Sequence, residues 1–274
     1  MMEHWLHIFV TTALASVCLA NYFCNLPCEK DENTVCRRKP CGCSERCGVH
    51  FRMLPIDGGA RKVLIDLHNK YRSTIANGYS IPGTSIKLPS ATDMIRLNYD
   101  QELEFVAQCY ANACMEWGAH DKCRRTSKFQ AAGQNMYTTY GSGNFNFSDE
   151  KYIEEAVTSW FNEVKDMEPD VVNSYRPTGK VIGHFTQLAW ARTSHIGCAR
   201  TMYGNRNIKG MYLYCNYGPG GNILGGTMYQ AGSPGDSCSI RSETYKNLCV
   251  HSNKVTEHEG DDWEDWEPPF PILE

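Results

Sequence analysis

The sequence GHFTQLAWART, residues 183–193, decides the predicted fold. Every second side chain of an extended segment lies on the same face. One face of this segment carries His184, Thr186, Leu188 and Trp190, and the other carries Phe185, Gln187 and Ala189. This alternation predicts a β-strand.

Two further extended runs follow. Residues 192–194 interrupt the pattern and His195–Ala199 restarts it, as expected of an antiparallel neighbour. A third run, Met211–Tyr217, stops at the turn residues 218–221. Because three strands are the minimum for a self-supporting sheet, the sequence predicts a small antiparallel sheet.

The same residues resemble a known family. Gly183–Thr193 resembles the first signature of the CAP superfamily, which comprises cysteine-rich secretory proteins, insect antigen 5 and plant pathogenesis-related proteins of group 1. Tyr212–Ile223 resembles the second signature at every defined position. His68–Arg72 and Trp160–Val164 resemble the family's first-helix and cavity-glutamate motifs. The resemblance implies an α+β fold, a three-layer α-β-α sandwich (the CAP or SCP fold) with a small antiparallel sheet.

Helical spacing of apolar residues predicts three helices. They cover residues 60–76, residues 100 to about 117 and residues 149–167. Residues 79–100 contain Pro and Gly and are interpreted as a long surface connection. Residues 137–147 are interpreted as an aromatic-rich loop, which includes the acceptor triplet that makes Asn146 a predicted glycosylation site.

Four regions are predicted along the chain. Residues 1–20 look like a signal peptide, which implies a secreted, extracellular protein. Residues 21–58 form a cysteine-rich amino-terminal extension that resembles insect venom allergen antigen 5, and 59–225 form the CAP (SCP) domain. Residues 226–274 form a carboxy-terminal extension with an acidic tail. No other stretch reaches the ~18 apolar residues of a transmembrane helix.

Fourteen cysteines agree with an oxidising compartment. Secretion favours disulfides over zinc for the spacings Cys24-x3-Cys28 and Cys41-Gly42-Cys43. The antigen 5 resemblance implies the pairs Cys24–Cys36, Cys28–Cys123, Cys47–Cys114 and Cys198–Cys215. A Cys238–Cys249 loop is a further hypothesis, as is a bond from Cys109 to either Cys41 or Cys43. Removal of Cys18 with the signal peptide leaves an odd number, so one thiol is free or pairs between chains.

Net charge is −4, but residues 257–274 carry eight carboxylates and no Lys or Arg, so the remainder of the chain is mildly basic. Two interpretations of this tail remain open. It is solvated and disordered, or Trp263 and Trp266 dock it on a basic face. Nucleic-acid binding is excluded because basic residues cluster only in residues 37–39 and 124–125.

The resemblance implies a polar cavity formed by His68, Gln134, Glu163 and His184. Gln134 stands where most CAP domains have glutamate, which removes an anionic group. The two histidines, His68 and His184, are candidate ligands for a divalent metal such as zinc, although two imidazoles alone make a weak site. No other cofactor is expected. His120 is interpreted as structural.

The sequence offers no catalytic constellation. It lacks a nucleophile elbow and a His-Glu-x-x-His run, and Thr186 is the nearest hydroxyl to His184. The resemblance implies a non-enzymatic protein that binds a small hydrophobic ligand (a lipid, sterol or fatty acid) or an extracellular target. The aromatic loop beside the cleft motif would support a hydrophobic ligand, or is an ordinary loop packed on the core. Alternatives are a metal-assisted hydrolase or protease using His68, His184 and Glu163, and a pure extracellular protein-interaction module.

Overall fold

The computed structural model describes residues 22–28, 31–38, 41–115 and 119–251. The predicted signal peptide and the acidic tail, with Trp263 and Trp266, lie outside the described residues.

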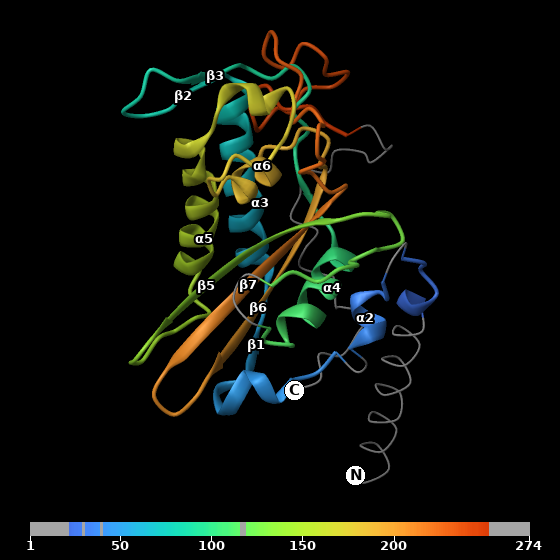
Figure 1. The fold of residues 1–274 in the computed structure, drawn as a ribbon, viewed down its shortest axis with the longest axis vertical. Coiled ribbons are helices and arrows are strands. Elements are labelled where there is room, and N and C mark those ends of the chain that lie inside the picture. The colour runs from blue at the N-terminus through green and yellow to red at the C-terminus, as the bar shows by residue number, and fades with distance from the viewer. Residues whose placement is uncertain (1–21, 29–30, 39–40, 116–118, 252–274) are drawn as a thin grey trace.

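A five-stranded sheet forms the middle layer (Figure 1). Its main path is antiparallel and contains β1 (Arg52–Leu54), β6 (His195–Gly204), β7 (Lys209–Gly218) and β5 (Gly133–Gly141), in that order. β4 (Asn98–Tyr99) pairs in parallel with the beginning of β6. In the long β6–β7 hairpin Cys198 lies directly opposite Cys215.

Alternate residues of β7 pack against two different layers of helices, one on each face of the sheet. Met211, Leu213, Cys215 and Tyr217 join the larger core, with α3 (Gly58–Ala76), α5 (Lys151–Asn162) and α6 (Gly183–Leu188). Tyr212 and Tyr214 join a second core under α4 (Gln101–Ala111). At Gly197 a Cβ atom would lie 2.2 Å from the backbone nitrogen of Glu104, so α4 packs directly on the sheet backbone. The three-layer α-β-α sandwich is confirmed.

The helical spacings locate α3 and α5. α3 begins after the Asp57 cap, whose side chain accepts a hydrogen bond from the Ala60 N–H. α5 continues into a short 3₁₀ helix, η2 (Glu163–Asp166), and a further 3₁₀ turn, η3 (Pro169–Val172), follows. α4 ends at Ala111, before the expected residue 117, because Cys114 takes a left-handed conformation with φ of 45°.

The predicted strand over residues 183–193 is wrong. Residues 183–188 form α6, whose buried Phe185 and Leu188 are three residues apart, as on one face of a helix. The chain after α6 is irregular and is held by the buried guanidinium of Arg72. That group donates to the carbonyl oxygens of Ile95, Leu188, Trp190, Ala191 and Thr193 at 2.6–3.1 Å.

Two segments expected to be loops are structured. Residues 137–141 belong to β5, which pairs with β7 along its whole length. The segment 79–100 contains β2 (Tyr79–Ser80), β3 (Lys87–Leu88) and β4, and it buries Leu88 and Met94 in the larger core. It is therefore not a surface connection.

The amino-terminal segment contains α2 (Thr34–Arg37) and the 3₁₀ helix η1 (Glu45–His50). Phe23 and Val35 form a small core with Val106 and Cys109 of α4. The structure has the disulfides Cys24–Cys36, Cys28–Cys123, Cys41–Cys109, Cys47–Cys114, Cys198–Cys215 and Cys238–Cys249. Of the two candidates for Cys109 it is thus Cys41 that bonds, and Cys43 is the free thiol among the described cysteines.

Residues 226–251 pack against the body of the molecule. Met228, Tyr229 and Leu248 are buried in the larger core. The backbone of Cys249 forms isolated β-bridges with that of Ile95 and of Arg241. Within the described ranges, no helix has the length and apolar character needed to cross a membrane.

Candidate functional site

Glu163 and His184 form the centre of the candidate site. Glu163 lies where α5 ends, and one carboxylate oxygen accepts hydrogen bonds from the backbone N–H groups of His184 and Phe185 at 2.9 and 3.1 Å. These two groups belong to the first turn of α6, which has no capping side chain at Ile182. Glu163 therefore caps α6 from another helix, and its negative charge is favourable at that end.

The second carboxylate oxygen of Glu163 fixes the ring of His184. It lies 2.6 Å from Nδ1 of His184. Because a carboxylate accepts, Nδ1 carries the hydrogen, and the lone pair of the neutral imidazole is on Nε2. That Nε2 makes no hydrogen bond to the described residues, and the His184 side chain is 27% exposed. The ring thus presents an acceptor to solvent or a ligand.

Gln134 joins this region to His120. Gln134 lies on β5 opposite Asn216 of β7, and its amide nitrogen donates to Oδ1 of Asn216 at 2.9 Å. Its Oε1 lies 2.8 Å from Nδ1 of His120, so this nitrogen is also a donor and Nε2 carries the lone pair. Burial lowers the pKa of His120, and the nearby charge of Arg124 acts in the same direction.

His68 is not part of this surface, and its predicted place in the cavity is wrong. It is fully buried on the stripe of α3 that includes Leu64 and Arg72. Its Nδ1 donates to the Leu64 carbonyl at 2.7 Å, and its Nε2 accepts from the Tyr217 hydroxyl at 2.9 Å. Both nitrogens are engaged, so His68 offers no lone pair to a metal. Burial lowers its pKa to about 4.

A buried polar chain nevertheless connects His68 to His184. Asn135 donates to the Tyr217 hydroxyl at 3.1 Å and to the backbone carbonyl of His184 at 3.0 Å. Trp160 lies between the two imidazoles, with ring centroids 6.2 Å from His68 and 6.1 Å from His184. His68 therefore supports the site from inside the core.

Sequence reasoning missed His120. Its neighbours, unlike those of His68, form no apolar helical stripe, and Gln134 follows 14 residues later. That contrast was the available signal: a histidine on a buried stripe satisfies its nitrogens in the core, whereas one in an irregular polar segment is free to face a cleft.

Thr186 is not placed as a nucleophile. Its hydroxyl lies 2.7 Å from Oδ1 of Asn222 and 3.2 Å from the Gly183 carbonyl. Asn222 in turn donates to the same carbonyl at 2.8 Å. Since a nucleophile must lie within reach of its base, this network instead fixes the turn at residue 222 against the beginning of α6.

Exposed apolar side chains lie on both segments that this network joins. Val181, two residues before Gly183, is 69% exposed, and Ile223 and Leu224, directly after Asn222, are 59% and 72% exposed. We call these three residues the apolar rim. The hydrogen bond from Asn222 to the Gly183 carbonyl joins the two segments that carry them.

The aromatic loop does not line this site. β5 begins at Gly133 beside the site and ends at Gly141, and Tyr140 is therefore about 20 Å along the strand from Gln134. Phe147 is buried in the larger core. Residues 140–147 of this segment therefore lie toward the other end of the sheet.

The sequence matches known proteins along most of its length. Residues 65–217 match the family described as CAP: Cysteine-rich secretory protein family. Venom allergen-1 of Aedes aegypti is 34% identical over 93% of this chain and 97% of its own length. This chain belongs to the CAP family. Venom allergen 5 of Polybia paulista is 34% identical over 77% of this CAP protein and 99% of its own length.

Solved structures are also similar to this CAP protein. NaASP2 with Zn2+ is 27% identical, with a TM-score of 0.58, over 76% of this CAP protein and 100% of its own chain. In this CAP protein the Nε2 atoms of His120 and His184 make no hydrogen bond to the described residues. No group of three or more His, Cys, Asp or Glu side chains in the described part of the chain is arranged to hold a metal. The residues therefore fit only an open site, completed by water or ligand.

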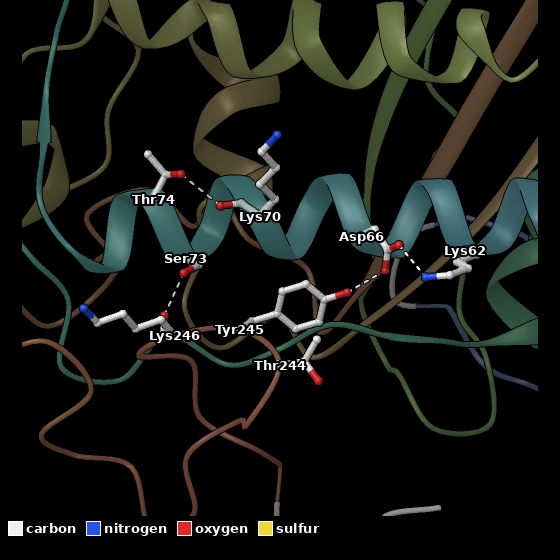
Figure 2. A pocket seen from close by; sticks show the side chains of 8 residues that line it. All are labelled: Lys62, Asp66, Lys70, Ser73, Thr74, Thr244, Tyr245 and Lys246. Carbon is white, nitrogen blue, oxygen red and sulfur yellow. Dashed lines mark hydrogen bonds and ion pairs between the residues drawn. The ribbon is translucent and has the colours of Figure 1, made fainter. Parts of the chain in front are cut away.

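An open cavity of this CAP protein lies elsewhere, between α3 and residues 244–246 (Figure 2). Its volume is about 540 Å³, and Lys62, Lys70 and Lys246 are among its lining residues. Hydrogen bonds from Tyr245 to Asp66 and from Ser73 to the Lys246 carbonyl cross it. Its lining side chains carry ammonium, carboxylate and hydroxyl groups beside the apolar stems of the lysines, whereas a site for a small hydrophobic ligand has few charged groups.

Proposed function

We propose that this CAP protein is a secreted, non-catalytic binding protein that recognises an extracellular protein target with the face formed by His184 and the apolar rim. The observation that carries the proposal is the rigid presentation of His184. Glu163 fixes its ring and its helix together, and no hydroxyl or thiol of the described residues is hydrogen-bonded to its Nε2. Without a nucleophile, an oriented imidazole serves recognition better than turnover.

The composition of the face supports a protein target. Three exposed aliphatic side chains, on segments joined to the helix of the oriented imidazole, would combine apolar area with a hydrogen-bond acceptor, as at the centres of protein interfaces. The relatives named venom allergens agree with an extracellular role. A small hydrophobic ligand is less well supported, because charged side chains line the cavity beside α3 and Tyr140 lies far along β5 from Gln134.

A binding screen against displayed extracellular proteins tests the proposal. We expect saturable binding that weakens at least tenfold in a Val181→Asp/Ile223→Asp variant. Ile208→Asp is the matched control, because Ile208 is also exposed but lies at the far end of the β6–β7 hairpin. Equal losses in both variants would contradict the assignment of this face.

Two measurements on the same secreted protein separate the alternatives. Stoichiometric lipid in an organic extract analysed by mass spectrometry would favour a hydrophobic ligand. Bound metal, together with hydrolysis of peptides or esters that is lost in His184→Ala, would favour a metal-assisted hydrolase; in that case zinc supplies Lewis-acid polarisation of the bound group.

A further inference from the structure

The residues 119–126 that carry His120 form neither helix nor strand, so side chains must fix their course. Asp121 is the main anchor, with a side chain only 4% exposed. Its Oδ1 accepts a hydrogen bond from Nε of Arg124 at 2.6 Å. The same guanidinium donates to the Ala132 carbonyl at 2.7 Å, directly before β5. Asp121 and Arg124 thus tie the histidine segment to the strand that carries Gln134.

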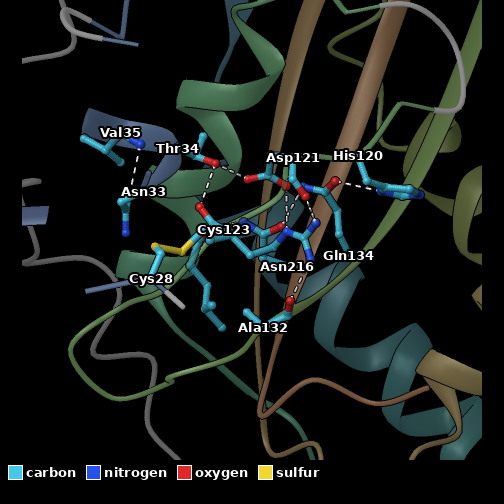
Figure 3. A network of polar contacts seen from close by, with 12 residues as sticks. Cys28, Asn33, Thr34, Val35, His120, Asp121, Cys123, Ala132, Gln134 and Asn216 are labelled. Atoms are coloured by element: carbon cyan, nitrogen blue, oxygen red, sulfur yellow. Dashed lines mark hydrogen bonds and ion pairs between the residues drawn. A yellow bond between two sulfur atoms is a disulfide. The ribbon is translucent and has the colours of Figure 1, made fainter. Parts of the chain in front are cut away.

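The other side of Asp121 is held by the amino-terminal segment (Figure 3). The hydroxyl of Thr34 lies within hydrogen-bond distance of Oδ2 of Asp121 and of the Cys123 carbonyl. The Thr34 backbone N–H donates to that carbonyl at 2.8 Å. Asn33 donates to the Arg125 carbonyl at 2.9 Å, and Cys28 is bonded to Cys123. Five contacts from Cys28, Asn33 and Thr34 therefore converge on residues 121–125.

These contacts are buried, which makes them selective for one geometry. Thr34 is 3% exposed and Asn33 is 2% exposed. A buried carboxylate that lost its hydroxyl partner would have to find another or turn toward water. Because His120 precedes Asp121 directly, such a rotation would move its ring away from Oε1 of Gln134.

We propose that Thr34 is a positioning residue for His120, so that the amino-terminal extension is a working part of the His120–His184 site. The hydroxyl of Thr34 holds Asp121, and Asp121 places the imidazole so that Nδ1–H points to Gln134 and Nε2 faces outward. The inference rests on the proposed function only in taking this site as the binding site.

The test compares Thr34→Val with Thr34→Ser in the full-length secreted protein. Valine keeps the shape and removes the hydroxyl, whereas serine restores it. Long-range ¹⁵N–¹H NMR reports the tautomer of each histidine. We expect His120 to be an Nδ1–H tautomer in the wild type and in Thr34→Ser, and to lose that preference in Thr34→Val while His184 is unchanged. Thr74→Val is the control, because that exposed hydroxyl bonds only to its own helix at Lys70.

A Thr34→Val protein with an unchanged His120 tautomer would overturn the inference, as would equal changes at all histidines. Asp121→Asn provides a second variant if the valine protein does not fold. It keeps the side-chain shape and weakens the contacts to Thr34 and Arg124, and the same selective change at His120 is expected.

Zn2+ alone serves as a separate probe of the site. Loss of a group that orients a histidine ligand lowers metal affinity by roughly 10–100-fold, so Thr34→Val should bind Zn2+ at least about tenfold more weakly than Thr34→Ser in a calorimetric titration. A Zn2+ affinity equal in the two variants would contradict the positioning role. If the tautomer changes as expected but the screen finds no protein target, Thr34 still positions His120 and it is the proposed function that fails.

Discussion

The carboxylate of Glu163 binds His184 twice, through the ring Nδ1 at 2.6 Å and through the backbone N–H at 2.9 Å. One side chain therefore sets both the position of α6 and the orientation of the imidazole that α6 carries. The first turn of this short helix depends on a residue of another element, because its own sequence supplies no cap.

Glu163→Ala should destabilise the protein by about 2 kcal/mol, the upper range for loss of a helix cap. The two backbone N–H groups of α6 would lose their acceptor, and the His184 ring would rotate freely. Urea denaturation measures the free energy of unfolding. Glu154→Ala, an exposed carboxylate on α5, is the control and should change it by less than about 0.5 kcal/mol. Equal effects would show that Glu163 is not a cap.

Arg72→Lys should cost about 3 kcal/mol, although it conserves charge. Six hydrogen bonds from the guanidinium reach five carbonyl oxygens, and an ammonium group has only three donors. Burial lowers the pKa of Arg72 to about 9, so the group remains charged at neutral pH. Thermal and urea unfolding check the prediction, with exposed Arg192→Lys as control. A loss below about 1 kcal/mol would mean that other groups hold the chain after α6.

His68 should make the protein less stable as the pH falls below 6.5. Burial lowers its pKa from 6.5 to about 4 in the folded state, so the unfolded chain takes up the proton first. The contribution is fully present above pH 6.5, declines between 6.5 and about 4, and amounts to about 3 kcal/mol in total. Urea midpoints from pH 7.5 to 4.5 measure it. The pH dependence of stability that His68 contributes should be absent from His68→Gln. If stability falls with pH in parallel in the wild type and the variant, His68 is not its source.

Cys43 should be the one described cysteine that iodoacetamide labels without reduction. Burial raises the pKa of its thiol, so labelling should be slow at neutral pH and faster as the pH approaches 9. Peptide mapping under non-reducing conditions should recover Cys41 linked to Cys109. A peptide in which Cys43 is linked to Cys109 would show that Cys43 forms the disulfide and that Cys41 is the free thiol.

Asn146 should carry a glycan when the protein is secreted, because it is exposed and begins an acceptor triplet. Enzymatic deglycosylation should reduce the mass of the wild type and leave Asn146→Gln unchanged. An unmodified wild type from a glycosylating host would show that the triplet is not used.

The long periodic elements could be predicted from sequence. The spacing of Leu64 and Ile75 located α3, and the runs at 195–199 and 211–217 located the β6–β7 hairpin. α6 could not be located, because six residues are too few to separate helix from strand by period, and its cap comes from Glu163 in another element.

The candidate site was predictable in part. Glu163 and His184 meet as expected, whereas His68 was assigned by motif although its helical spacing from Leu64 and Arg72 indicates burial. His120 depends on contacts from Thr34, which lies 87 residues from Asp121. No local pattern reports a contact over that separation.

The disulfides of the amino-terminal extension also determine when the protein can complete its covalent structure during synthesis. Cys28, Cys41 and Cys47 are translated early, but their partners follow 95, 68 and 67 residues later. During synthesis these thiols must remain reduced, or in exchangeable pairs, until α4 and the segment after it have been added. The amino-terminal extension can therefore reach its final covalent form only after residue 123 has been added.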